Sequence, residues 1–383
     1  MINELKLRRN KLCEKMKEQN IDACLVSAKI NLYYLTGKIY DGYFYITQSG
    51  EARLFVKRMM DFQNEKVFAI RKPEQIMELV LQEGLELPKR IMIEDDYLSA
   101  GEWLRLSKVF PEAEPVSSIV RGVRTVKTDY EISQITESAT KHSLLYSKIK
   151  EIYKPNMTDL ELSAELEKQA RLLGHLGIFR VFGSSMEIFM GSILAGDNSQ
   201  NLSPYDFALG GAGMHPSIPI GLNVTRLKDG MTVMVDMSGN FTGYITDMTR
   251  VFSIGEISQK AYDLHKINIE ILNELSHLGK IGVSCGELYE KAISMVESYD
   301  VWEYYMGNVQ QTKFVGHGVG LEINEAPVLS KGNKMLLQKG MTIAIEPKFV
   351  LPGTGAIGNE NTYLVCENGL KNLTIFDENI IKL

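Results

Sequence analysis

The residues with the clearest chemical potential are two aspartates on neighbouring strand-like runs. In MTVMVDMSGNFTGYITDMTRVF (residues 231–252), two apolar runs flank the turn-rich segment SGNFTG. A hairpin centred between Phe241 and Thr242 would place Asp236 directly opposite Asp247, with both carboxylates on one face of the sheet. Like charges in that position repel, and a carboxylate on an apolar strand is costly to bury without a partner. A divalent cation between them is the simplest solution, because it accepts several carboxylate oxygens.

A simpler interpretation of this pair stays open, in which one aspartate caps the turn and the other is solvated. Three residues further along the chain favour the metal site. His317 lies between two glycines in FVGHGVGLEINEAP, Glu346 lies in the apolar run TIAIEPKFV, and Glu360 begins a strand-like run in GAIGNENTYLV. Flanking glycines allow a close approach to a site, and a carboxylate in apolar surroundings needs a strong partner. Each residue alone could be structural, but together the five suit two hard or borderline divalent cations.

The elements that must position these residues fall into two groups. Residues 1–125 alternate short apolar runs with helical patterns, which predicts an α/β domain. Two capping boxes, Thr128 with Glu131 and Thr158 with Glu161, then predict two long helices. From residue 175 onward strand-like runs dominate, beginning with GIFRVFGS, around one helical stretch, KAYDLHKINIEILNELSHL. Helices and strands that are grouped in this way predict an α+β fold with a mostly antiparallel sheet.

Composition narrows the class of protein. The chain has 383 residues, which favours two domains over one. Its 42 Lys+Arg against 48 Asp+Glu give a net charge of −6, which argues against a nucleic-acid or anionic-membrane partner. Four scattered cysteines without a CxxC pair fit a reducing compartment. With no export signal and no apolar run of about 18 residues, we expect a soluble, cytoplasmic protein.

At the residues described above, the sequence resembles the pita-bread metallopeptidases, the superfamily of prolidase, aminopeptidase P, methionine aminopeptidase and the metal-free creatinase. The strongest matches are VDMSGNFTGYITDMTR, GHGVGLEINE, IEPKFV and NEN, and NLYYLTG and RTVKTDYEI resemble the amino-terminal domain and domain junction of the prolidase and creatinase branch. The resemblance implies a creatinase/prolidase-like N-terminal domain over residues 1–125 and a pita-bread catalytic domain over residues 126–383. It also implies a homodimer, and a dinuclear site whose ligands are Asp236, Asp247, His317, Glu346 and Glu360.

Four positions depart from the pattern that the resemblance implies. Family histidines are replaced by Asn324, Lys313 and, in an alignment that needs a one-residue gap, Ile220, and a family arginine is replaced by Gly358. Those histidines normally bind substrate and stabilise the tetrahedral intermediate. Lys313 and Asn324 can both donate hydrogen bonds, so either could stabilise an oxyanion. His215, in GGAGMHPSIP, could approach from a shifted loop or could serve only its own turn.

The resemblance and the ligand set together predict metal-assisted hydrolysis of a C–N amide bond. Two divalent ions with a bridging hydroxide would act on the scissile carbonyl, and Glu346 would carry the proton to the leaving nitrogen. Mn²⁺ is the first choice, with Co²⁺, Fe²⁺ and Zn²⁺ as alternatives. The leading function is an Xaa-Pro dipeptidase or aminopeptidase acting on peptides. The replaced histidines favour a second, creatinase-like hydrolase of a small non-peptide amide or amidine, while the complete ligand set argues against a third, a binding module without turnover.

Overall fold

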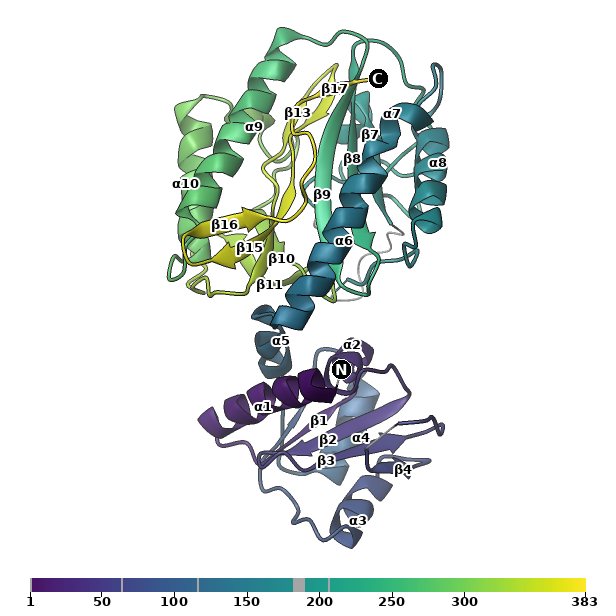
Figure 1. Cartoon of the computed structure of the whole chain (residues 1–383), viewed down its shortest axis with the longest axis vertical. Coiled ribbons are helices and arrows are strands. Elements are labelled where there is room, and N and C mark those ends of the chain that lie inside the picture. Colours follow the sequence, from purple (N-terminus) through teal and green to yellow (C-terminus); the bar gives the residue numbers. More distant parts are fainter. Residues whose placement is uncertain (1, 63–64, 116, 182–189, 206) are drawn as a thin grey trace. The chain divides into compact units, whose positions relative to one another are not determined.

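The chain divides into two compact units, residues 1–124 and 125–383 (Figure 1). A computed structural model describes residues 2–62, 65–115, 117–181, 190–205 and 207–383. No helix within these ranges combines the length and the apolar character needed to cross a bilayer.

The N-terminal unit is a six-stranded mixed sheet with strand order β4-β3-β2-β1-β5-β6. Its strands are β1 (Ala23–Val26), β2 (Gly42–Thr47), β3 (Ala52–Val56), β4 (Val67–Ala69), β5 (Ile91–Ile93) and β6 (Ala113–Pro115). Its helices are α1 (Ile2–Glu18), α2 (Lys29–Thr36), α3 (Gln75–Gln82), α4 (Ala100–Val109) and α5 (Ser118–Thr125). Strands β1 and β5 are parallel and β1 and β2 antiparallel. The mixture of helices with a largely apolar sheet confirms the expected α/β character.

The second unit is built on three sheets. A four-stranded sheet has the order β17-β9-β8-β7, a five-stranded sheet has the order β11-β10-β12-β15-β16, and β13 pairs with β14. The strands are β7 (Gly191–Ala195), β8 (Met231–Asn240), β9 (Ile245–Ile254), β10 (Phe314–Gly318), β11 (Glu325–Ser330), β12 (Thr342–Ile345), β13 (Phe349–Leu351), β14 (Gly355–Ile357), β15 (Asn361–Cys366), β16 (Gly369–Asn372) and β17 (Ile381–Lys382). Among these pairs only β17 and β9 run parallel, so the predicted, mostly antiparallel α+β arrangement is confirmed.

Helices cover the two larger sheets of this unit (Figure 1). They are α6 (Asp129–Ser147), α7 (Ile149–Ile152), α8 (Asp159–Leu172), α9 (Gln259–Leu278) and α10 (Cys285–Ser298), with two 3₁₀ turns at Gly196–Gln200 and Trp302–Tyr304. Apolar residues of α6, α7 and α8 pack with the β7–β9 sheet, and those of α9 and α10 pack with the β10–β12–β15 sheet. Both predicted capping boxes are present at the starts of α6 and α8.

The β8–β9 hairpin has a different register from the predicted one. Asp236 pairs with Thr249 and Asp247 pairs with Ser238, so the two aspartates are diagonal neighbours and do not face each other directly. The connection, residues 241–244, is centred one residue later than predicted and contains a glycine, Gly243, at φ +91°. A register shift of two residues keeps every side chain on its face, because the period of a strand is two. Both carboxylates therefore still point to one side of the sheet.

Two other predicted elements differ in the structure, and one helix was not predicted. GIFRVFGS does not begin a strand, since residues 177–181 are irregular, and its last three residues lie outside the described part of the chain. A second helix, α10, follows α9, and its capping box of Ser284 with Glu287 was present in the sequence but not used in the prediction. TIAIEPKFV is split between β12 and β13, because Pro347 has no N–H with which to continue a ladder.

Candidate metal centre

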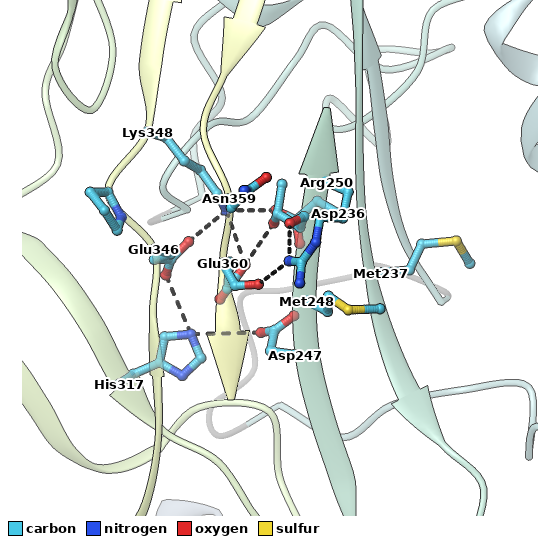
Figure 2. Close-up of polar contacts among 12 residues, drawn as sticks. Asp236, Met237, Asp247, Met248, Arg250, His317, Glu346, Lys348, Asn359 and Glu360 are labelled. Atoms are coloured by element: carbon cyan, nitrogen blue, oxygen red, sulfur yellow. Dashed lines mark hydrogen bonds and ion pairs between the residues drawn. The ribbon is translucent and has the colours of Figure 1, made fainter. Parts of the chain in front are cut away.

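Five side chains converge where the two larger sheets of the second unit meet (Figure 2). Asp236 lies on β8, Asp247 on β9 and His317 on β10. Glu346 follows β12 directly, and Glu360 directly precedes β15. All five line one cavity, although up to 124 positions separate them in sequence. The structure thus brings together every residue that the sequence singled out as a metal ligand.

Backbone pairing across the two sheets places Glu360 beside the aspartate strand. Thr249 and Glu360 form an isolated antiparallel bridge, with N···O distances of 3.3 and 3.2 Å. The hydroxyl of Thr249 donates a hydrogen bond to Glu360 Oε2 at 2.7 Å, and Arg250 Nη1 donates to the carbonyl oxygen of Glu360 at 2.8 Å. Arg250 is fully buried, and its other donors are bound mainly by carbonyl oxygens of the chain. These contacts fix the position of Glu360 relative to Asp247.

The glycines beside His317 have a steric function. A Cβ atom at Gly316 would lie 2.2 Å from the carbonyl oxygen of Ala344, and one at Gly318 would lie 2.2 Å from that of Ala326. Because β10 lies between β11 and β12, only glycine fits at both positions. The close strand packing holds the imidazole at the edge of the cavity.

The acidic and imidazole groups form two overlapping sets of candidate metal ligands. Asp247, His317 and Glu360 offer atoms within 4.8 Å of one another, and so do Asp236, Glu346 and Glu360. His317 Nε2 lies 3.4 Å from Glu346 Oε1 and 3.7 Å from Asp247 Oδ2. Glu360 Oε1 is buried and has no hydrogen-bond partner among the described residues. Oxygen and imidazole donors at these separations suit a hard or borderline divalent ion.

The orientation of His317 also fits a metal ligand. Its Nδ1 lies 3.1 Å from the carbonyl oxygen of Gly318, which can only accept, so Nδ1 carries a proton in this contact. Nε2 points toward Glu346 and Asp247. The hydrogen bond to Glu346 and its charge raise the pKa of His317, although burial acts in the opposite direction. An ion at Nε2 would therefore have to displace a proton.

Lys348 is a site residue that the sequence analysis missed. Its ammonium nitrogen lies 2.6 Å from Glu346 Oε2, 2.8 Å from Asp236 Oδ2 and 3.3 Å from Glu360 Oε2 (Figure 2). The side chain is only 1% exposed. A signal was available in IEPKFV, because residues two apart in an extended segment share a face and a lysine in an apolar run needs an acidic partner.

The carboxyl groups respond unequally to this lysine. Burial, followed by the charges of its acidic neighbours, raises the pKa of Asp247 well above its usual value and that of Glu360 to about 7. Burial acts in the same direction on Glu346, but the charge of Lys348 and the bond from His317 outweigh it and lower its pKa to about 2. The three surrounding carboxylates hold the pKa of Lys348 well above its usual value despite burial. Asp247 and Glu360 are therefore the carboxyl groups whose negative charge the protein alone compensates least.

The residues considered for substrate binding do not all lie in the cavity. Asn324 and Ile220 line the same cavity as the five ligands. Lys313 is exposed and lines an adjoining pocket that shares Phe314 with the cavity wall. His215 is exposed, and its Nδ1 lies 2.7 Å from the hydroxyl of Ser217 within the same turn.

Fold and ligand set together define a metallopeptidase of the pita-bread type. Residues 133–367 match metallopeptidase family M24, and residues 8–126 match the creatinase/prolidase N-terminal domain. The first match covers more than half of the chain, so this protein belongs to metallopeptidase family M24 and is a peptidase. Membership implies divalent metal ions, and the buried donors described above fit such an ion.

Known relatives match the chain from end to end. An Xaa-Pro dipeptidase of Pyrococcus furiosus is 27% identical over 97% of this chain and 98% of its own length. An uncharacterised peptidase of Bacillus subtilis is 23% identical over 98% of this chain and all of its own. A solved Xaa-Pro dipeptidase of Bacillus anthracis superposes with a TM-score of 0.81 at 22% identity, covering 99% of this chain and 100% of that one. At that identity the superposition establishes the fold alone.

Proposed function

We propose that the protein is an Xaa-Pro dipeptidase or aminopeptidase, which hydrolyses the amide bond to a proline nitrogen. The observation that carries the proposal is the convergence of Asp236, Asp247, His317, Glu346 and Glu360 on one cavity in an M24 chain. The full-length similarity to a protein named Xaa-Pro dipeptidase supports this choice of substrate.

The donor set favours Mn²⁺, with Co²⁺, Fe²⁺ and Zn²⁺ as alternatives, since carboxylates dominate and one imidazole is present. When bound, a divalent ion polarises a carbonyl group and lowers the pKa of a coordinated water. The sequence suggests two ions, but the number depends on Lys348.

The chain's own residues supply proton transfer and positioning. Glu346 is held ionised by its ion pair with Lys348, so it would start the reaction able to accept a proton, which it would pass to the leaving nitrogen. Asn324 lines the cavity and offers an amide donor to a developing oxyanion. Lys313 and His215 are exposed, so their proposed role is to bind the part of a substrate that extends beyond the cavity. Apolar walls would exclude water and accept a pyrrolidine ring; they include Phe179, Phe207, Leu209, Ile220, Phe314 and Ile323.

A second candidate function is hydrolysis of a small non-peptide amide or amidine. One observation favours it: Ile220 and Asn324 line the cavity at positions where the family resemblance leads us to expect histidines. A site with fewer imidazole donors for an extended peptide would suit a smaller substrate.

The experiment that tests the proposal is a substrate panel with metal-depleted protein to which Mn²⁺ is returned. We expect cleavage of Xaa-Pro dipeptides or of longer peptides with proline at the second position, and no cleavage after Asp247→Ala or Glu346→Ala. Turnover of small amides alone would select the second function. Normal turnover by either variant, or no turnover of any substrate by metal-loaded protein, would overturn the proposed mechanism.

We also propose a cytoplasmic location, on the cysteine usage, and a homodimer, on the family resemblance. Size-exclusion chromatography with light scattering tests the second point, since a monomer at micromolar concentration would contradict it.

A further inference from the structure

Lys348 places its ammonium group among the carboxylates of the candidate metal site. Its ammonium nitrogen contacts three carboxylates, those of Asp236, Glu346 and Glu360. These three residues are also the complete second set of candidate metal ligands. An ammonium group has three donor hydrogens, so one hydrogen is available for each carboxylate.

Hydrogen bonds and close packing hold the backbone at Lys348 in place. The carbonyl oxygen of Lys348 accepts a hydrogen bond from Met306 N at 2.7 Å, and the side-chain amide of Asn268 donates to the preceding carbonyl, that of Pro347. A Cβ atom at Gly358 would lie 3.1 Å from Lys348 Cα, so the absence of a side chain there allows the segment to lie close. The ammonium is therefore held in the cluster by its surroundings and does not line the cavity.

The remaining donors lie on the other side of the cluster. Glu360 Oε1 has no hydrogen-bond partner among the described residues, whereas Glu360 Oε2 is bound by Lys348 and Thr249. The two carboxylate oxygens of Glu346 also have different partners, because Oε2 contacts Lys348 and Oε1 lies 3.4 Å from His317 Nε2. Asp247 has no contact with Lys348 among the ion pairs and hydrogen bonds of the site. One atom each from Asp247, His317 and Glu360 thus lies within 4.8 Å of the other two. Glu346 Oε1, 3.4 Å from His317 Nε2, borders the same position.

Charge counting alone does not separate one ion from two, because with Lys348 present one divalent ion leaves the four carboxylates at −1 and two leave them at +1. Four carboxylates carry −4, and Lys348 with one divalent ion supplies +3. Two divalent ions without the lysine would supply +4, and two with it would supply +5 within a buried cluster. A second ion would, however, lie against the ammonium group, and like charges at such separations repel strongly in a low-dielectric site.

We infer that Lys348 takes the place of one metal ion, so that this M24 site holds a single divalent ion on Asp247, His317, Glu346 and Glu360. This inference rests on the proposed metallopeptidase function but departs from the dinuclear site that the family resemblance implies. Asp236 then serves as a partner of Lys348 and not as an essential ligand.

The test is the number of Mn²⁺ ions bound per chain, measured by equilibrium dialysis with elemental analysis, together with the electron paramagnetic resonance spectrum. We expect one ion per wild-type chain and the spectrum of an isolated Mn²⁺ without exchange coupling. Lys348→Ala should bind two ions and show a coupled pair. Lys127→Ala is the matched control, because Lys127 is equally buried and ion-paired, 3.0 Å from Glu325, and its variant should still bind one ion.

A second variant keeps the inference testable if Lys348→Ala fails to fold. Asp236→Asn should still bind one ion with little change in affinity, whereas His317→Ala should bind none. Two ions or a coupled pair in the wild type, one ion in folded Lys348→Ala, or loss of the ion in Asp236→Asn would each overturn the inference. Two ions with Xaa-Pro cleavage would overturn the role of Lys348 and leave the proposed function intact. One ion without any peptide cleavage would overturn the proposed function and leave the role of Lys348 intact.

Discussion

The hydroxyl oxygen of Tyr146 lies 2.5 Å from the carbonyl oxygen of Met248, the residue that follows Asp247. The same hydroxyl accepts a hydrogen bond from the backbone amide of Met237, the residue that follows Asp236, at 3.1 Å. One buried side chain of α6 therefore holds the two aspartate strands at the level of the site.

Tyr146→Phe should weaken both the fold and the metal site, because it leaves buried backbone groups without a partner. We expect a loss of about 1–3 kcal/mol in the free energy of unfolding and an increase of roughly 10–100-fold in the Mn²⁺ dissociation constant. Urea denaturation and metal titration measure these changes. Tyr305→Phe is the matched control, since the Tyr305 hydroxyl is buried without a partner among the described residues. Equal effects of the two variants would show that the hydroxyl of Tyr146 has no positioning role.

Mn²⁺ should raise the thermal stability of the wild type, because a ligand that binds only the folded state stabilises it. At a free concentration 100 times the dissociation constant, the gain is about 2.7 kcal/mol. His317→Ala should lose this response, since it removes the one imidazole of the site. Differential scanning calorimetry with and without Mn²⁺ measures the shift in Tm. His277→Ala, at an exposed position of α9, should respond like the wild type. A full Tm shift in His317→Ala would contradict the assigned ligand.

His142 should make the fold sensitive to acid. It is fully buried on α6, and burial lowers its pKa to about 3. The unfolded chain takes up this proton near the ordinary histidine pKa of about 6.5, while the folded chain does not. The unfolded state therefore binds more protons below pH 6.5, and stability falls as the pH drops from about 6.5 toward 3, by at most about 1.4 kcal/mol per pH unit from this group.

Urea denaturation of wild type and His142→Gln at pH 7.5 and pH 5 measures this contribution. The variant is expected to be less stable at pH 7.5, because the contact between His142 Nδ1 and the Thr246 hydroxyl changes, but to lose less stability on acidification. His277→Gln provides the comparison at an exposed histidine. The same loss between the two pH values in wild type and His142→Gln would refute the assignment.

Gly358→Ala should disturb the segment that carries Lys348. Gly358 has φ +134°, and an added Cβ atom would lie 2.7 Å from the carbonyl oxygen of Pro347. Backbone strain of this kind costs about 1–3 kcal/mol, and the steric conflict adds to it. Gly353→Ala separates the two contributions, because Gly353 also has a positive φ but has no atom within 4 Å of an added Cβ. Equal losses in urea denaturation would show that the close approach of Pro347 contributes nothing.

Local sequence signals accounted for much of the second unit. The capping boxes at Thr128 and Thr158 define the starts of α6 and α8, because the bonds of a capping box form within three residues. The register of the β8–β9 hairpin was wrong by two residues, since the position of a connection depends on how the turn packs. The aspartates nevertheless share a face, because a shift of two leaves strand alternation unchanged.

The sequence by itself determined which side chains have metal-binding chemistry, since residue type, flanking glycines and apolar context are local properties. Only the tertiary structure decided which of these carboxylates contact Lys348 and which remain available to a metal ion. Lys348 meets Asp236 across 112 positions and Glu360 across 12, and such contacts exist only once two sheets have packed against each other. The same packing placed Asn324 in the cavity and left Lys313 and His215 exposed. Spacing along the chain cannot specify these positions, because they depend on the distance between strands that are remote in sequence.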